Sequence, residues 1–479
     1  MKQPSRVHFV AIGGTGMGSL AGLLKSRGIV VTGSDRALYP PMSTALERWG
    51  IPVFEGFDAE QLRRAAPDLV VIGNAVRSDN PEARAAIEGG YRYASFPDAL
   101  YELAIASRHP VVVSGTHGKT TTTNLVAHLL TATGRDPSLL VGGISLDFDG
   151  SFRDGSGEHF VVEGDEYDTA FFDKTPKFLH YHPKTLVVTS IEFDHADIYR
   201  DLEHVKSAFR ELVEGMPVDG TIAAAGDDDN LRDVLRSASC RVLRYGAERG
   251  GDRDAELDWI ARQLQPGPEG TRFEVHAPGR APIPALLPMY GVFNVDNALG
   301  ALAAVDALGV TPGEAVSALQ SLRGVKRRQE VRGEVNGITV IDDFAHHPTA
   351  VRASIESLRA RYPGRRLVAI FEPRTNTSRR AIFQADYAQS FDAAARVLVH
   401  RVPDEPIYSA TGDVSERFSA DQLTQDVTRR GVPAECFEEV DEIVDHVAQE
   451  ARPGDVLLVM SNGSFDDIWE KILEALKRA

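Results

Sequence analysis

The sequence contains very little cysteine. Its 479 residues include only Cys240 and Cys436, and so few thiols exclude a fold held together by a disulfide framework. Long apolar runs are also missing, because none approaches the ~20 residues that a membrane-spanning helix needs. The N-terminal stretch MKQPSRVHFVAIGG enters a glycine turn too early for a signal peptide. We therefore expect a cytoplasmic protein without a membrane segment.

Positive charge is scarce as well. The chain has 52 Lys and Arg against 69 Asp and Glu, a net charge of −17. An acidic surface repels polyanions, so we expect neither a nucleic-acid partner nor an anionic membrane partner. A phosphate-bearing ligand would have to be held by local devices such as loops, metals and single basic residues.

A glycine-rich segment, GTHGKTT at 115–121, is the most informative motif. It follows the apolar run Val111–Val113 and precedes apolar residues at helical spacing from Leu125 to Leu130. A buried strand, a glycine turn with Lys and Thr, and a helix start are the layout of a phosphate-binding loop. The general pattern has a further glycine where Val113 stands. An ordinary strand-to-helix turn would not explain the lysine and the run of Thr, so we predict a nucleoside triphosphate site.

Strand and helix patterns alternate along the chain, which is typical of α/β folds. VHFVAIGG, GIVVTGSD and LVVIGNAV are predicted strands before the loop, and HFVVEGDE, TLVVTSIEFDH and TIAAAGDDDN follow it. The polar stretch 246–258 is expected at the surface. The basic segment Lys326–Gly333 is the expected hinge before further strands such as GITVIDDFAHHP and GDVLLVMSNGS. We predict three α/β domains, residues 1–108, 109–325 and 326–479.

The N-terminal turn, Ala11 to Gly16, resembles the dinucleotide fingerprint, with Ala11 in place of the first glycine. Asp35 ends the second predicted strand, where a ribose-binding acid often lies. This signal alone does not distinguish NAD from another nucleotide that carries a diphosphate. A purely packing role for the glycines is the alternative.

Acidic residues follow two predicted strands of the central region. Glu163–Asp168 contains four carboxylates, and Glu192–Asp197 contains three with His195. The carboxyl ends of strands are where ligands bind in open α/β sheets, and carboxylates there suit Mg²⁺ held jointly with phosphate oxygens. A solvated acidic loop is the alternative for each cluster alone.

Three further segments have weaker signals. Asn294 and Asn297 open an Ala-rich helix, where Asn is often only a cap. Arg327 and Arg328 form a basic pair that could lie at the surface. The run Asp342–Pro348, DDFAHHP, follows a strand, and adjacent acids and histidines at a strand end favour a site over a core.

Read together and in order, these segments resemble the Mur ligase family, ATP-dependent amide-forming enzymes of peptidoglycan synthesis. The resemblance runs nearly end to end, whereas folylpolyglutamate synthases lack the first domain. It implies an N-terminal Rossmann-like domain for UDP, a central P-loop ATPase-type domain and a C-terminal Rossmann-like domain.

The resemblance also implies ATP and Mg²⁺ as cofactors. The residues that would hold ATP are Gly115, Thr116, His117, Gly118, Lys119, Thr120, Thr121, Asn294, Asn297, Arg328 and Asp342. Mg²⁺ would be bound by Thr120, Glu163 and His195. The implied catalytic residues are Lys119, Glu163, His195, Arg328 and Asp342.

The substrate sites are implied in the same way. The UDP part of a sugar nucleotide would lie on Gly13, Gly14, Thr15, Gly16, Met17, Gly18, Ser34, Asp35 and Asn74. The amine substrate would enter from the third domain, next to His347, Arg374, Asn376, Ser461 and Asn462.

Four stretches are similar to those family members that attach the murein tripeptide L-alanyl-γ-D-glutamyl-meso-diaminopimelate to UDP-N-acetylmuramate. They are YPPMST at 39–44, EYDTAFFDKTPKFLHYHPKT at 166–185, EPRTNT at 372–377 and VMSNGSFDDI at 459–468. Members that add L-alanine to UDP-N-acetylmuramate are the nearest alternative. A nicotinamide-dependent oxidoreductase and a non-catalytic nucleotide switch are alternatives from other classes.

The sequence departs from the family's pattern at two positions. Phe293 stands where members usually have His, so the adenine site is expected to be packed there. Phe209 stands at the position of a carbamylated lysine, so we expect none, and Lys206 is expected at the surface. The implied reaction passes through an acyl phosphate, and His346, His347 or a carboxylate could accept the proton of the attacking amine.

Overall fold

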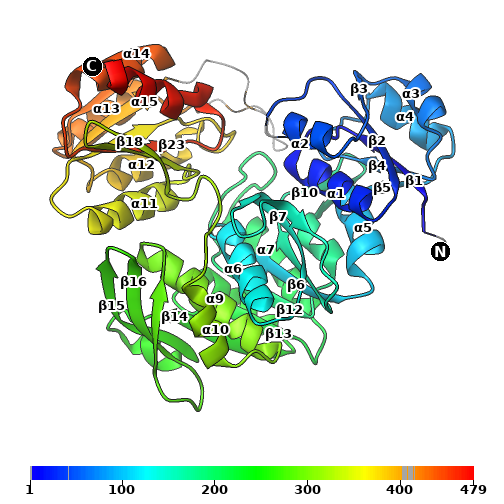
Figure 1. Ribbon diagram of the computed structural model, residues 1–479, viewed down its shortest axis with the longest axis horizontal. Helices are drawn as coiled ribbons and strands as arrows, with labels where there is room; N and C mark the ends of the chain where they lie inside the picture. Colours follow the sequence, from blue (N-terminus) through cyan, green and yellow to red (C-terminus); the bar gives the residue numbers. More distant parts are fainter. Residues whose placement is uncertain (1–2, 41, 402–406, 408–413, 415, 479) are drawn as a thin grey trace.

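The computed structural model describes residues 3–40, 42–401, 407, 414 and 416–478. Pro41, within the YPPMST stretch, lies outside these residues. Three separate α/β sheets define a first, a central and a third module along the chain. In Figure 1 the first module lies at the upper right and the third at the upper left, and the central module lies below them. The predicted α/β class with three domains is confirmed.

The first module is a five-stranded parallel sheet in the order β3-β2-β1-β4-β5. Its strands are β1 (Arg6–Val10), β2 (Val30–Asp35), β3 (Val53–Glu55), β4 (Leu69–Ile72) and β5 (Tyr93–Ser95). Its helices are α1 (Thr15–Ser26), α2 (Met42–Arg48), α3 (Ala59–Ala65), α4 (Pro81–Glu88) and α5 (Phe96–Leu100).

Helix α1 of the first module rests directly on the central module. A side chain at Gly22 would overlap Trp49 and Phe152, so the absence of a Cβ lets the helix approach. Ser19 and Ser151 are hydrogen-bonded through their hydroxyls at 2.6 Å. The two modules therefore share a packed interface.

The central module is a ten-stranded sheet in the order β17-β16-β15-β14-β13-β12-β6-β9-β7-β8. Its strands are β6 (His109–Ser114), β7 (Ser138–Ser145), β8 (Gly150–Arg153), β9 (His159–Gly164), β12 (Thr185–Val188), β13 (Thr221–Ala225), β14 (Arg241–Ala247), β15 (Trp259–Gly267), β16 (Gly270–His276) and β17 (Ile283–Leu287). A separate hairpin joins β10 (Asp168–Ala170) and β11 (Asp173–Pro176). The helices are α6 (Lys119–Ala132), α7 (Leu202–Glu214), α8 (Asp229–Val234), α9 (Val292–Ala307) and α10 (Pro312–Leu319).

Strands β6, β9, β12 and β13 are parallel and lie side by side. Their apolar residues are almost all fully buried, as expected for strands covered on both faces. The predicted strands of this region are confirmed, although β12 ends at Val188, before the acidic segment. That segment is therefore a loop at the carboxyl end of the sheet.

The third module is a six-stranded sheet in the order β18-β19-β23-β20-β21-β22, parallel except for β18. Its strands are β18 (Glu330–Val335), β19 (Ile338–Asp343), β20 (Leu367–Phe371), β21 (Arg396–His400), β22 (Ala434–Phe437) and β23 (Val456–Met460). Its helices are α11 (Pro348–Arg361), α12 (Gln384–Ser390), α13 (Ala420–Arg429), α14 (Val440–Glu450) and α15 (Ile468–Arg478).

The predicted hinge, Lys326–Gly333, is only partly irregular. Arg327 and Gln329 adopt left-handed φ values of 59° and 53°, which sharply turn the chain between the modules. From Glu330 onward the segment is strand β18. The paired half of the segment therefore belongs to the sheet of the third module, and the turn is confined to its first residues.

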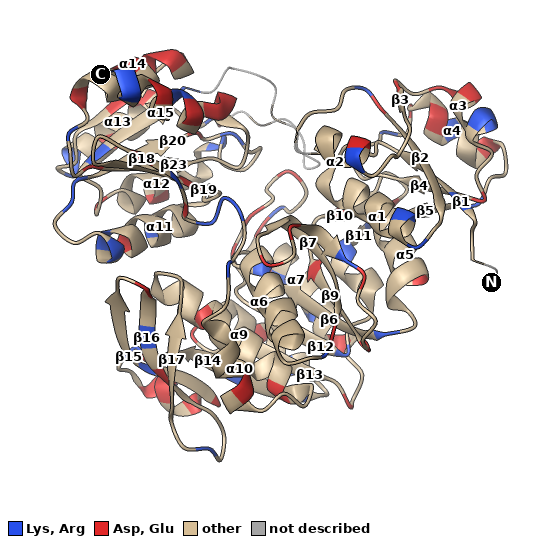
Figure 2. Ribbon diagram, viewed as in Figure 1, with Lys and Arg blue, Asp and Glu red and all other residues tan. Residues whose placement is uncertain are grey.

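Acidic segments recur on the outer helices α3, α4, α14 and α15 (Figure 2). Among the residues that the structure describes, no helix combines the length and the apolar character needed to cross a bilayer.

Two side chains of helix α7 test expectations made from the sequence. Phe209 is fully buried and packs against Phe178 with ring centroids 5.1 Å apart. The expectation of a surface position for Lys206 is wrong, because its side chain is 10% exposed and forms ion pairs with Glu203 and Asp233 at 2.7 Å. Lysine can lie under neighbouring side chains when acids pair with its ammonium group.

Candidate active site between the central and third modules

The glycine-rich loop joins β6 to α6, in the strand–loop–helix arrangement predicted from the sequence. Gly115 and Gly118 have φ values of 133° and 79°, which side chains disfavour. A Cβ at Gly115 would overlap Thr189, and one at Gly118 would overlap Asn297. Both glycines are therefore needed for the shape of the loop. The Thr116 and His117 amides donate to the Ser190 backbone oxygen and hydroxyl at 2.9 and 3.1 Å, so the amides that can face an anion are those at the start of α6.

Lys119 is held inside this loop. Its ammonium donates to the backbone oxygen of Gly115 at 2.8 Å and to Glu166 Oε2 at 2.7 Å. Burial alone would lower the pKa of Lys119, but the charges of Glu166 and Asp165 outweigh it and raise that pKa. The side chain is thus a fixed positive charge beside the loop.

Glu166 is a site residue that the sequence analysis did not single out. It is 2% exposed and also lies 3.2 Å from His195 Nε2, so one carboxylate joins Lys119 to His195. Ligand atoms of Asp165, Glu166 and His195 all lie within 4.8 Å of one another. The EGDE run contained the signal, but sequence does not tell which of its acids points inward.

A second set of contacts joins Thr120, Glu163 and Arg328. Thr120 Oγ1 donates to Glu163 Oε1 at 3.2 Å, and Arg328 Nη2 donates to Thr120 Oγ1 at 3.2 Å. The Gly142 amide holds the other carboxylate oxygen at 2.8 Å. Arg328 therefore reaches the phosphate loop from the segment that leads into the third module.

In this set, burial disfavours the charged forms of Glu163 and Arg328. It raises the pKa of Glu163 and lowers the pKa of Arg328. A hydroxyl and a carboxylate side by side form an oxygen-rich pair of the kind that Mg²⁺ prefers. His195 lies with Asp165 and Glu166 instead, so the predicted metal ligands occupy two adjacent places.

Asn294 and Asn297 lie behind the loop, at the start of α9. Asn294 Nδ2 donates to the Tyr290 carbonyl at 2.8 Å, and Asn297 Nδ2 lies 3.4 Å from Asn294 Oδ1. Because Asn297 contacts Gly118, this pair supports the loop directly. Phe293 is half-buried beside Gly291.

Asp342 is the penultimate residue of β19 and is fully buried. The guanidinium of Arg327 donates to it at 3.1 Å and to the Ser461 carbonyl at 2.8 Å. Burial raises the pKa of Asp342 to about 6, against the opposing charge of Arg327. In this arrangement Asp342 fixes the turn between the modules, and the neighbouring Arg328 is the residue that contacts the loop.

The N-terminal turn is arranged around Asp35. The Gly13 amide donates to Asp35 Oδ2 at 2.7 Å, and α1 begins at Thr15, directly after Gly14. Asn74 is exposed just beyond β4, next to the turn because β1 pairs with β4. Gly13, Gly14, Thr15, Gly16, Met17 and Gly18 thus form the turn and the first helical turn.

Ser34 does not fit the expected contact with uridine. Its side chain is fully buried, and its hydroxyl donates to Glu82. His8 Nε2 lies 2.8 Å from the same carboxylate. Ser34 therefore belongs to a buried polar network under the sheet, which sequence alone does not reveal because its partners are distant in the chain.

Four of the five predicted amine-substrate residues follow β20 and β23, whereas His347 follows β19 as the N-cap residue of α11. Ser461 is fully buried, and its hydroxyl donates to Glu372 and accepts from the Gly463 amide. Arg374 packs against Gly463, and Asn462 Oδ1 is a buried acceptor without a hydrogen-bond partner. Glu372 is a further acid of this place that the sequence analysis did not single out.

Several contacts hold the third module against the loop that follows β12. Asn376 Nδ2 donates to Asp197 Oδ2 at 3.3 Å, and the Ala196 amide donates to Thr377 Oγ1 at 3.1 Å. His347 Nε2 lies 3.3 Å from the Phe193 carbonyl. His347 and Asn376 are therefore brought close to His195, whereas Arg374, Ser461 and Asn462 stay at their own strand ends.

The titration of His195 depends on its acidic neighbours. Burial would lower the pKa of His195, but the charges of Asp194 and Glu166 raise it to about 9. Burial lowers the pKa of His346, and burial with the neighbouring His117 lowers the pKa of His347 to about 4. At neutral pH His195 is charged without a metal, whereas His346 and His347 are neutral.

We predict that Glu166→Gln lowers the pKa of His195, because it removes one of the charges that raise it. Since the folded pKa is above 6.5, protonated His195 adds stability below that pH and loses it as the pH rises through about 9. NMR titration of the histidine resonances in metal-free protein checks this. Glu203→Gln, at the exposed partner of Lys206, is the control, and an unchanged His195 titration in Glu166→Gln contradicts the account.

Three family models match successive parts of the chain. They describe the catalytic domain of the Mur ligase family over residues 6–108, the Mur ligase middle domain over 113–305 and a Mur ligase, glutamate ligase domain over 327–463.

Curated relatives match over almost the full length. The UDP-N-acetylmuramate–L-alanyl-γ-D-glutamyl-meso-2,6-diaminoheptandioate ligase of Escherichia coli is 39% identical, over 99% of this chain and 98% of that protein. The UDP-N-acetylmuramate–L-alanine ligase of Burkholderia ambifaria is 35% identical, over 99% of this chain and 98% of that protein.

Solved structures show the same relationship. A murein peptide ligase from Psychrobacter arcticus has a TM-score of 0.73 at 35% identity, and 99% of each chain is covered. A UDP-N-acetylmuramate–alanine ligase from Thermotoga maritima has a TM-score of 0.78 at 26% identity, again over 99% of each chain.

Proposed function

The chain belongs to the Mur ligase family of ATP-dependent ligases, and on that premise we propose that it joins a murein tripeptide to UDP-N-acetylmuramate. The peptide is L-alanyl-γ-D-glutamyl-meso-diaminopimelate, and its free amine forms an amide with the lactyl carboxylate. The E. coli relative named for this reaction, at 39% identity, supports the proposal. The reaction would serve peptidoglycan recycling in the cytoplasm.

One observation carries the chemistry. Lys119, the Thr120–Glu163 pair, His195 and Arg328 converge around one phosphate loop. A carboxylate that attacks a triphosphate brings anions together, and fixed cations make that approach tolerable. No protein nucleophile is needed, because the substrate carboxylate itself attacks the γ-phosphorus.

The chain's own residues divide this work. Lys119 and the loop amides would hold the β- and γ-phosphates, and Arg328 would neutralise charge on the transferring group. Thr120 and Glu163 would hold one Mg²⁺, and His195 with Glu166 a second. Bound Mg²⁺ supplies Lewis-acid stabilisation of phosphate charge. The acyl phosphate that forms is then attacked by the peptide amine, and inorganic phosphate leaves.

The three modules would each supply one substrate site. The proposed domain bounds are 1–108, 109–325 and 326–479. The N-terminal turn of the first domain, with Asp35 and Asn74, would take the UDP end. The phosphate loop of the central domain would take ATP. The third module would take the peptide near Arg374 and Asn462. Closure of the third module excludes water, which would otherwise hydrolyse the acyl phosphate.

L-Alanine addition is the second candidate. The solved alanine ligase from T. maritima has the higher TM-score, 0.78 against 0.73 for the murein peptide ligase. Sequence identity favours the tripeptide reaction, at 39% against 35% for curated relatives. The two candidates share every step except the choice of amine.

We predict that phosphate release from ATP and UDP-N-acetylmuramate depends on the tripeptide. Release is measured side by side with tripeptide, with free L-alanine and with no amine, and the amide product is followed by mass spectrometry. The proposal requires product with the tripeptide and none with L-alanine. Product with L-alanine alone assigns the chain to the second candidate, and no product with either amine refutes both.

We predict that Arg328→Lys lowers kcat by about 100-fold, the typical cost of removing one preorganised donor from developing charge. Lysine keeps the charge but loses the planar fork of donors. The KM for UDP-N-acetylmuramate should stay unchanged, because Arg328 contacts the phosphate loop and not the N-terminal turn that would take the UDP end. Arg332→Lys is the matched control, because Arg332 lies in the same segment and pairs only weakly with Glu330 and Glu470 at 3.6 and 3.7 Å. Equal kcat values for the two variants would show that Arg328 plays no part in the transfer.

A further inference from the structure

Three groups of acids and histidines among the described residues bring ligand atoms within 4.8 Å of one another. In Asp98–Asp173–His180, both ring nitrogens already have close partners, Asp98 at 2.7 Å and Thr175 at 2.9 Å. Asp165–Glu166–His195 belongs to the site described above. In the third group, His117–Glu192–His347, the sequence placed His117 near ATP and His347 near the amine substrate, but neither role explains why the three side chains come together.

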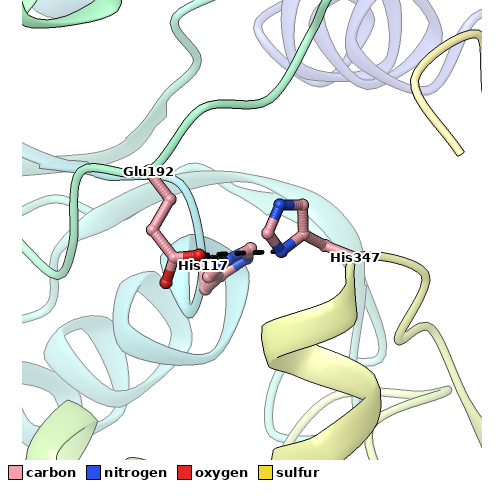
Figure 3. Close-up of side chains that lie close together, drawn as sticks. All are labelled: His117, Glu192 and His347. Carbon is pink, nitrogen blue, oxygen red and sulfur yellow. Dashed lines mark ion pairs between the residues drawn. The ribbon is translucent and has the colours of Figure 1, made fainter. Parts of the chain in front are cut away.

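The members of this third group come from two modules. His117 lies in the phosphate loop between β6 and α6, and Glu192 lies in the loop after β12. His347 is the N-cap residue of α11 in the third module. Figure 3 shows the two rings and the carboxylate converging on one point.

The spacing of these three side chains is that of metal ligands. Glu192 Oε2 lies 3.6 Å from His117 Nε2 and 3.7 Å from His347 Nδ1. These distances are too long for hydrogen bonds. Zinc–ligand bonds of about 2.0–2.1 Å at tetrahedral angles put ligand atoms roughly 3.4 Å apart. For these two pairs, a bound ion would therefore require movements of only a few tenths of an ångström, and the two histidine nitrogens lie within 4.8 Å of each other.

The lone pairs of both histidines are available. His117 Nε2 is buried without a hydrogen-bond partner, which is unusual for a buried polar atom. His347 Nε2 faces the Phe193 carbonyl and so carries the proton, which leaves the Nδ1 lone pair directed to Glu192. Among the residues that the structure describes, the one hydrogen bond to that lone pair is long, from the Thr349 amide at 3.4 Å.

The surroundings orient the ligands and favour a cation. The Thr349 hydroxyl donates to Glu192 Oε2 at 2.7 Å, as partners of ligating carboxylates commonly do. The N-terminus of α11 places positive potential at His347, which disfavours a cation. The negative charges of Glu192 and the buried Asp194 act in the opposite direction and favour positive charge at His347. Burial lowers the pKa of His347 to about 4, so it is neutral and able to bind a metal at pH 7.

We propose that His117, Glu192 and His347 bind one divalent transition-metal ion of the zinc class, which fastens the third module to the phosphate loop. Two nitrogens and one carboxylate suit zinc, whereas Mg²⁺ prefers oxygen ligands. The site is separate from the Mg²⁺ positions on Thr120, Glu163 and His195. Because its ligands come from both modules, the ion binds only when the third module lies against the loop.

Calorimetric titration of Zn²⁺ into the full-length protein tests this proposal without any substrate. Excess Mg²⁺ is present to occupy the oxygen-rich positions. We expect one Zn²⁺ per chain, and binding weakened by more than about tenfold in His117→Asn, Glu192→Gln and His347→Asn, since even an orienting partner is worth about 10–100-fold. His446→Asn is the control, because His446 faces Glu435 at 4.0 Å elsewhere in the third module.

The three proposed ligands lie on three different elements. If one variant misfolds, the other two still test whether the site binds Zn²⁺. Co²⁺ bound to the wild type provides a measurement that needs no variant, because nitrogen ligation changes its visible absorption. Wild-type protein that binds no Zn²⁺ in excess Mg²⁺ overturns the proposal. The proposal is also overturned if folded His117→Asn, Glu192→Gln and His347→Asn variants still bind Zn²⁺ as the wild type does. Loss of Zn²⁺ binding in His195→Asn instead overturns it as well.

Discussion

The ion pair between Lys119 and Glu166 is the contact on which the candidate site depends. A lysine ammonium inside a phosphate loop must lose much of its water, and an unpaired buried charge costs several kcal/mol. Glu166 offsets that cost at 2.7 Å and also lies 3.2 Å from His195. One carboxylate thus holds in place both Lys119, the proposed phosphate-binding cation, and His195, the proposed metal ligand, before any ligand arrives.

The second constraint is that the site is built by two modules. The loop and its acids lie at the carboxyl ends of β6, β9 and β12, whereas Arg328 comes from the turn that leads to the third module. Left-handed residues at Arg327 and Gln329 and the Arg327–Asp342 pair fix that turn. The orientation of the third module therefore decides whether Arg328 and His347 reach the loop.

Local patterns in the sequence predicted the loop, its flanking strand and helix, and the acidic strand ends. These features depend on neighbours in the chain, so periodicity and glycine spacing are enough to find them. Contacts between distant segments were not predictable in the same way. Ser34 is turned toward Glu82, Asp342 toward Arg327, and Lys206 toward Asp233.

Part of the central sheet was also not predicted from the sequence. The antiparallel strands β15, β16 and β17 extend it beyond the parallel part, and the sequence analysis had not predicted them. Their burial patterns mix buried, partly buried and exposed residues, so they lack the continuous apolar runs of strands covered on both faces. Glu166 was missed for another reason, since four acids in one short run do not reveal which side chain points at Lys119.

The central claim is that this site activates a carboxylate as an acyl phosphate. Its most direct test uses UDP-N-acetylmuramate with ¹⁸O in the lactyl carboxylate, ATP and the tripeptide, and follows the released phosphate by ³¹P NMR. Phosphoryl transfer to the carboxylate, followed by attack of the amine, moves one ¹⁸O into phosphate for each amide formed. Unlabelled phosphate, formed together with amide, would contradict the account.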